Sequence, residues 1–260
     1  MDDARGGLLP RIREVAAQTC ALVAPRQCPC GTDGAWLCPG CAAALESPPV
    51  RVESCCDALQ QLSAARVREE GAHRPAGVDH TSLLPVLALG EYAGDLQRMV
   101  LAWKNGGMLH LGRRIAPALA PAVTTLAAEA RVRRPLLVPV PSRRSARLRR
   151  GEDHTGELAR DLARLGAGRA RLLRAVPTTG QEGQGARQRR TRRIRLSPAA
   201  ARRAGEDRAP VVIVDDIVTT GATLRGMHEA LTEAGARVLG AVVIASARVP
   251  APAVPPGAAP

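Results

Sequence analysis

The stretch Val211-Val-Ile-Val-Asp-Asp-Ile-Val-Thr-Thr-Gly-Ala-Thr-Leu224 decides the fold. Its first four residues are apolar and β-branched, a composition typical of a central strand buried in a parallel sheet. Two carboxylates, Asp215 and Asp216, follow at the strand end, where open parallel sheets bind ligands. The residues after them predict a helix over 223–234 that is closed by Gly235. A buried strand, a polar loop and a helix in this order indicate an α/β fold.

The loop after the carboxylates has the composition of a phosphate site. It contains Thr219, Thr220, Gly221, Ala222 and Thr223. The N-terminus of a helix offers unpaired N–H groups and partial positive charge to a monophosphate, and threonine hydroxyls add donors. The glycine allows close backbone approach or a positive φ. The carboxylates suit hydroxyl groups or hydrated Mg²⁺, so a sugar phosphate satisfies every part of the stretch.

Other interpretations of this stretch fit less well. Simple helix capping by Asp and Thr explains neither the adjacent carboxylates nor the four β-branched residues before them. The glycine and lysine spacing of a Walker A loop is absent, and no dinucleotide-binding glycine pattern follows a predicted strand.

Apolar patterns on both sides of this stretch predict more strands and helices. Strands are predicted over 86–92, 136–140, 172–176 and 238–244, and helices over 8–24, 95–102, 112–130 and 157–165. Their alternation predicts a mostly parallel sheet flanked by helices. Residues 46–76 are polar and irregular, and we expect a linker with some helix around 58–70. Residues 178–195 lack an apolar face and predict a mobile loop.

We expect four parts in the chain. They are a leading helix with a cysteine-rich module over 1–50, a linker over 51–82, the main α/β domain over 83–247 and a disordered Pro- and Ala-rich tail over 248–260.

Two cysteine pairs near the N-terminus predict a structural Zn²⁺ site. They are Cys28-Pro-Cys30 and Cys38-Pro-Gly-Cys41. Zinc ribbons normally place two residues between each pair of cysteines, so the first pair is one residue short. Substitution by another cysteine (Cys20, Cys55 or Cys56), a module held by packing after loss of zinc, and a redox Cys-x2-Cys pair are the alternatives. Four thiolates would leave no open position for catalysis by the metal.

The composition limits the possible partners. The formal net charge is +13, and Lys104 is the single lysine among 37 basic residues. Such charge indicates either a surface for anions, including nucleic-acid backbone, or drift in an arginine-rich chain. The three aromatic residues are too few for a base-stacking sheet. Because no apolar run is long enough to span a bilayer and the N-terminus lacks a signal peptide, we expect a cytoplasmic protein without membrane insertion.

The stretch from Val211 to Leu224 resembles the phosphoribosyl pyrophosphate (PRPP) motif of type I phosphoribosyltransferases. The resemblance implies that Asp215 and Asp216 are the catalytic carboxylates, which contact the ribose hydroxyls with Mg²⁺ nearby, and that residues 219–223 hold the 5′-phosphate. It also implies a pyrophosphate loop and a flexible loop that closes over the substrate. The candidate residues are Ser142, Arg143 and Arg144 in the first loop, and Gln181 and Arg187 in the second. A surface turn in an arginine-rich stretch is the alternative for the first. A solvated basic loop or a nucleic-acid contact is the alternative for the second.

Further stretches narrow the resemblance to the ComF family of competence-associated proteins. They are the segment from Tyr92 to Lys104, Val138-Pro-Val-Pro-Ser142 followed by Arg150-Gly151, the segment from Gln181 to Arg187, and the cysteine pairs. The family implies a role in natural competence and DNA uptake, with single-stranded DNA and a competence helicase as partners. The alternatives are an active phosphoribosyltransferase of nucleotide salvage type and a non-catalytic single-stranded DNA-handling protein. This chain lacks the family's aromatic residue after Gly151 and has His154 nearby.

Overall fold

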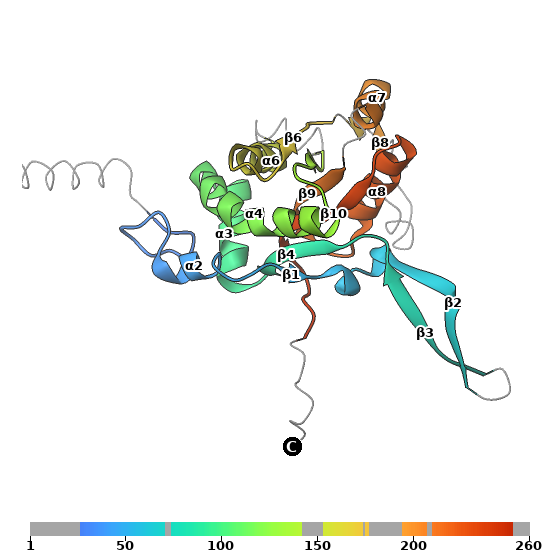
Figure 1. The fold of residues 1–260 in the computed structure, drawn as a ribbon. Coiled ribbons are helices and arrows are strands. Elements are labelled where there is room, and N and C mark those ends of the chain that lie inside the picture. Colours follow the sequence, from blue (N-terminus) through green and yellow to red (C-terminus); the bar gives the residue numbers. More distant parts are fainter. Residues whose placement is uncertain are drawn as a thin grey trace, which may run out of the picture.

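A six-stranded sheet forms the centre of the molecule (Figure 1). The computed structural model describes residues 27–70, 74–141, 153–173, 175–176, 194–206 and 210–251. The strand order is β1-β4-β10-β9-β5-β6, and β1 is the antiparallel member. The strands are β1 (Val50–Arg51), β4 (Val86–Glu91), β5 (Leu136–Pro139), β6 (Arg169–Ala170), β9 (Val211–Val218) and β10 (Val238–Ser246).

Helices cover both faces of this sheet. The α-helices are α2 (Pro39–Ala43), α3 (Gly94–Asn105), α4 (Gly112–Glu129), α6 (His154–Arg164), α7 (Pro198–Glu206) and α8 (Ala222–Glu233). Single 3₁₀ turns are η1 (Glu53–Cys55), η2 (Asp57–Leu59) and η3 (Leu109–Leu111). In β9, Val212 and Val214 pack into the apolar cluster with α3, α4 and α6, while Val211 and Ile213 pack into the cluster with α7 and α8. Alternate residues of one strand thus build two cores, as the two-residue period requires.

The predicted mostly parallel sheet with flanking helices is confirmed. Apart from the helix expected around residues 58–70, every predicted strand and helix that lies wholly within the described residues is present to within a few residues at each end. The helix predicted over 8–24, residues 178–193 of the predicted loop and the tail from residue 252 lie outside the described residues. The pattern did not predict β1, β6 or α7.

The prediction of helix around residues 58–70 is wrong. Strands β2 (Gln60–Glu70) and β3 (Arg74–Ser82) pair as an antiparallel hairpin that projects from the sheet (Figure 1). Residues 60–70 are rich in good helix formers, but such propensity is a weak prior that pairing with another strand overrides. The strand predicted over 172–176 is present only as β7 (Ala175–Val176), which pairs with β8 (Arg195–Leu196) outside the main sheet.

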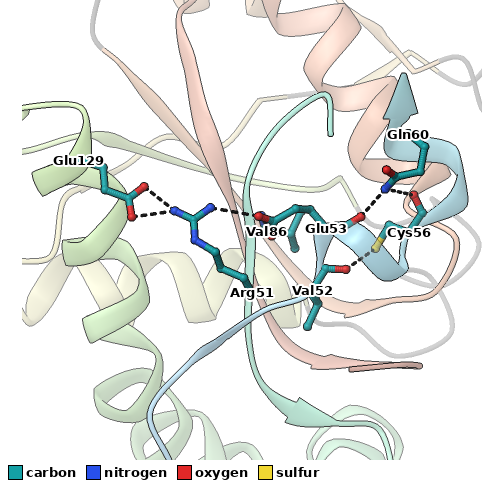
Figure 2. A network of polar contacts seen from close by, with 7 residues as sticks. All are labelled: Arg51, Val52, Glu53, Cys56, Gln60, Val86 and Glu129. Carbon is teal, nitrogen blue, oxygen red and sulfur yellow. Dashed lines mark hydrogen bonds and ion pairs between the residues drawn. The ribbon is translucent and has the colours of Figure 1, made fainter. Parts of the chain in front are cut away.

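A polar network fixes the segment that leads into the hairpin (Figure 2). Arg51 donates two hydrogen bonds of 2.7 Å to the carboxylate of Glu129 and one of 3.0 Å to Glu53. The other oxygen of Glu53 accepts the Val86 N–H at 3.1 Å. The amide of Gln60 donates to the Glu53 carbonyl at 2.6 Å. Turns η1 and η2 are therefore tied to the edge of the sheet and to the end of α4.

Candidate functional site

Strand β9 brings both predicted carboxylates to its carboxyl end. The strand runs on to Val218, so Asp215 and Asp216 lie within its second half. The carboxylate of Asp215 is buried and accepts the N–H of Asp216 at 2.9 Å. The carboxylate of Asp216 accepts the N–H of Ile217 at 2.7 Å through Oδ1. Local backbone bonds therefore orient both side chains.

A lysine that the sequence did not mark as a site residue contacts the second carboxylate. Lys104 lies in the last turn of α3, and its Nζ forms an ion pair with Oδ2 of Asp216. The two side chains are 29% and 14% exposed, so solvent screens the pair less than a fully exposed one. Two signals in the sequence pointed to it, since it is the single lysine of the chain and it ends the segment from Tyr92 that resembles the ComF family.

The loop after β9 adopts a left-handed turn at Gly221. Its φ is +79° and ψ is 3°, as the predicted positive φ required, and the residue caps the N-terminus of α8. Thr219 and Thr220 are exposed, and the Thr220 hydroxyl accepts the Ala222 N–H at 3.4 Å. Helix α8 begins one residue earlier than predicted. The loop thus presents exposed threonines beside the open end of a helix.

Turn η2, which is distant from this loop in the sequence, contacts it in the structure. The N–H of Ala58 donates to the Thr220 carbonyl at 2.8 Å, and the Ala58 carbonyl accepts from Arg225 in the first turn of α8 at 3.1 Å. Leu59 and Cys56 lie so close to Gly221 that an added Cβ would be 2.7 Å and 3.1 Å from them. Burial raises the pKa of the Cys56 thiol to about 12, so this thiol stays protonated and acts as packing.

The chain leaves β5 beside the first carboxylate. Val140 donates its N–H to the Val214 carbonyl at 2.8 Å, so residue 141 begins its loop next to Asp215. The candidate residues Ser142, Arg143 and Arg144 of that loop lie outside the described residues, as do Gln181 and Arg187. Beyond it, the His154 ring packs edge-on against Trp103 with centroids 5.2 Å apart, which makes it a packed residue of α6.

The four predicted zinc ligands lie together. The sulfurs of Cys28, Cys30, Cys38 and Cys41 are all within 4.8 Å of one another. A tetrahedral zinc with bonds of about 2.3 Å would place its sulfurs about 3.8 Å apart, and the Cys30 and Cys38 sulfurs are 3.6 Å apart. These four cysteines can therefore hold one metal ion. Within the described part of the chain, Cys55 and Cys56 do not belong to this group. Cys20 lies outside the described residues.

Backbone geometry compensates for the short first pair. The Gly31 N–H donates to the Cys28 carbonyl at 2.8 Å, and Gly31 has a φ of +95°, so a tight turn closes over Cys28-Pro-Cys30. Cys38 donates its N–H to the Cys28 sulfur at 3.2 Å, a contact that stabilises a thiolate. The pKa of Cys30 is lowered to about 6 by hydrogen bonds from Thr32, whereas burial raises the pKa of Cys41.

The cysteine module is packed into the main core. Cys28 and Cys41 are buried in the same apolar cluster as Trp103 of α3 and Leu119 of α4. Trp36 packs edge-on against His110 of η3 at 4.8 Å. Burial of ligands in a shared core is typical of a structural metal site.

The family comparison agrees with this geometry. Residues 156–256 match the family model of the phosphoribosyl transferase domain. The match includes β9, its carboxylates, the loop and α8, and the sheet with its flanking helices is that of a type I phosphoribosyltransferase fold. No curated protein matches the chain. In the described part of the chain, no helix is long and apolar enough to cross a membrane.

Proposed function

We propose that this chain binds PRPP, or a related ribose 5-phosphate, at the carboxyl end of β9. The observation that carries the proposal is the pair Asp215 and Asp216 followed by a left-handed Gly221 at the start of α8, inside a phosphoribosyltransferase domain. Adjacent carboxylates suit the two hydroxyls of a ribose, and the helix N-terminus suits its 5′-phosphate. The spacing of these groups along one strand, loop and helix matches a single sugar phosphate.

Each part of the ligand has proposed contacts. Asp215 and Asp216 accept the ribose hydroxyls, and residues 219–223 donate to the 5′-phosphate. Ser142, Arg143 and Arg144 take the pyrophosphate, and the segment with Gln181 and Arg187 covers it. The carboxylate oxygens fit Mg²⁺, a hard cation that prefers oxygen ligands and would neutralise charge on the diphosphate.

The reaction that this arrangement suits is transfer of phosphoribose. A nucleophile forms a bond to C1 of the ribose, and the bond from C1 to the pyrophosphate oxygen breaks with its electron pair leaving on pyrophosphate. The carboxylates hold the ring while positive charge develops on it, and donors in the loops stabilise the leaving anion. A phosphoribosyltransferase of salvage type is thus the proposed enzyme class, and its acceptor is open.

Calorimetry with PRPP and Mg²⁺ tests the binding proposal. We expect the double variant Asp215→Ala with Asp216→Ala to lose PRPP binding. The double variant Asp95→Ala with Glu157→Ala is the control, since it removes the same charge from exposed ion pairs on α3 and α6. Unchanged PRPP affinity in the first variant would refute the proposal. A screen for pyrophosphate release against candidate acceptors then identifies the reaction.

We further propose that the protein acts in the cytoplasm as a ComF-like protein of natural competence and DNA uptake. The net charge of +13, carried almost entirely by arginine, favours contact with single-stranded DNA backbone, and a competence helicase would be the partner that delivers it. A salt titration of single-strand binding tests this role. Affinity should fall steeply as salt rises, and a flat dependence would exclude a backbone-binding role for the arginines.

A further inference from the structure

Both carboxylate oxygens of Asp216 are engaged in the free protein. Oδ1 accepts the Ile217 N–H, and Oδ2 pairs with the ammonium of Lys104. The Ile217 contact is a local one, to the next backbone N–H along the strand. A ribose hydroxyl that donates to Oδ2 of Asp216 therefore has to compete with Lys104 or share that oxygen with it.

The placement of the lysine explains why it pairs there. Lys104 lies in the last turn of α3, and its ion pair shows that this end of the helix lies beside the Asp216 carboxylate. Asp215 and Asp216 are two adjacent negative groups, and without a bound cation their repulsion is unfavourable. The ammonium of Lys104 offsets that charge. If a ligand hydroxyl donates to Oδ2 of Asp216 in place of Lys104, the ammonium of Lys104 is released.

The residue type suits such a movement. An arginine fork binds a carboxylate through two fixed contacts, whereas the lysine ammonium is a point charge on a flexible four-carbon stem. Every other basic residue of the chain is arginine, so this position departs from the composition around it. The lysine can turn to a neighbouring anion without a change in the backbone of α3.

The chemistry of PRPP places an anion next to this position. The C1 diphosphate is attached to the carbon beside the one that carries the 2-hydroxyl. If Asp216 accepts the 2-hydroxyl, the diphosphate on the neighbouring carbon is the ligand anion nearest to the ammonium that the hydroxyl displaces. Ribose 5-phosphate has a hydroxyl at C1 and offers no such anion.

We propose that Lys104 is the residue by which this site distinguishes PRPP from ribose 5-phosphate. In the free protein its ammonium neutralises Asp216, and in the complex it contacts the C1 diphosphate. This inference rests on the proposed function. It predicts that the cost of breaking the ion pair is recovered with PRPP and not with ribose 5-phosphate.

Calorimetry with each ligand in the presence of Mg²⁺ tests the inference on the full chain. Lys104→Met should weaken PRPP binding about tenfold or more, because a charged contact is lost. It should leave the affinity for ribose 5-phosphate unchanged or tighter, because Asp216 no longer has to be released. Arg98→Met is the control, since it removes a positive charge that pairs with Asp95 on the same helix, and both affinities should then stay as in the wild type.

The outcomes separate the two proposals. Equal weakening of both ligands in Lys104→Met would assign Lys104 a merely structural role and overturn the inference, as would unchanged PRPP affinity. If the wild-type protein binds neither ligand, the proposed function fails and the inference falls with it. Thermal unfolding of each variant verifies the fold, and Lys104→Gln replaces Lys104→Met if the latter does not fold.

Discussion

Gly221 and Leu59 are in such close contact that a methyl group cannot be added between them. A Cβ on Gly221 would lie 2.7 Å from Cγ of Leu59, and the glycine has a φ of +79°. We expect Gly221→Ala to lower the free energy of unfolding by roughly 1–3 kcal/mol from overlap, on top of about 1 kcal/mol for the left-handed backbone. The measurement is urea denaturation, with ribose 5-phosphate affinity followed in parallel.

Gly235 supplies the matched control for that variant. It has a similar φ of +85°, and nothing lies within 4 Å of its Cβ position. Gly235→Ala should show only the backbone cost and keep ligand affinity. Leu59→Ala combined with Gly221→Ala should relieve part of the overlap. Equal losses for the two glycine variants would show that contact with Leu59 is unimportant.

Arg225 connects the first turn of α8 to the Ala58 carbonyl, and its loss should loosen the phosphate loop. Arg225→Met removes the hydrogen bond of 3.1 Å, and we expect a loss of about 1 kcal/mol in unfolding free energy. Affinity for ribose 5-phosphate should fall as well, because Ala58 also binds Thr220. Glu229→Gln weakens the exposed ion pair of Arg225 and keeps the Ala58 contact, so it should leave affinity unchanged. A similar fall in both variants would contradict the prediction.

Glu53 should matter more to stability than Glu129, although both pair with Arg51. The Glu53 side chain is 15% exposed and also accepts the Val86 N–H, whereas Glu129 is 48% exposed. We expect Glu53→Ala to cost about 1–3 kcal/mol, because the Val86 N–H loses its acceptor, and Glu129→Ala less than about 1 kcal/mol. Chemical denaturation of the two variants compares them. A larger loss of unfolding free energy for Glu129→Ala than for Glu53→Ala would mean that the contact between Arg51 and Glu129 stabilises the network more than the contact between Glu53 and Val86.

The cysteine group should control the stability of the whole sheet domain. Cys41 is fully buried in the core shared by α3 and α4, so a change at this residue disturbs that core as well as the cysteine group. Cys41→Ser should reduce bound zinc by metal analysis and lower the melting temperature by several degrees. Cys55→Ser, which changes a cysteine outside the group, should keep the zinc. Full metal content in Cys41→Ser would exclude this residue as a ligand.

The sequence pattern predicted those parts of the candidate site that are contiguous in the chain. Strand β9, its two carboxylates and the glycine turn are contiguous, so a short stretch of sequence contains all the information needed for them. The cysteine ligands were also predictable by type, although the turn at Gly31 that accommodates the short pair depends on backbone geometry that spacing does not encode.

The remaining features depend on contacts between distant segments. Lys104 meets Asp216 because α3 ends over one particular face of the sheet, and a single sequence does not show where a helix ends in space. The Ala58 contacts with Thr220 and Arg225 have the same origin. The hairpin of β2 and β3 was mistaken for helix, because its residues favour helix locally and only pairing between the two strands reverses that preference.

The hairpin leaves and rejoins the body of the protein at one place. The Leu83 N–H donates to the Leu59 carbonyl at 2.8 Å, so the residues just outside the two strands are already bonded to each other. The arm is therefore an insertion whose length is independent of the register of the central sheet. Engineered versions of this chain can therefore have a longer, shorter or different hairpin, while Leu59 keeps its position against the glycine turn.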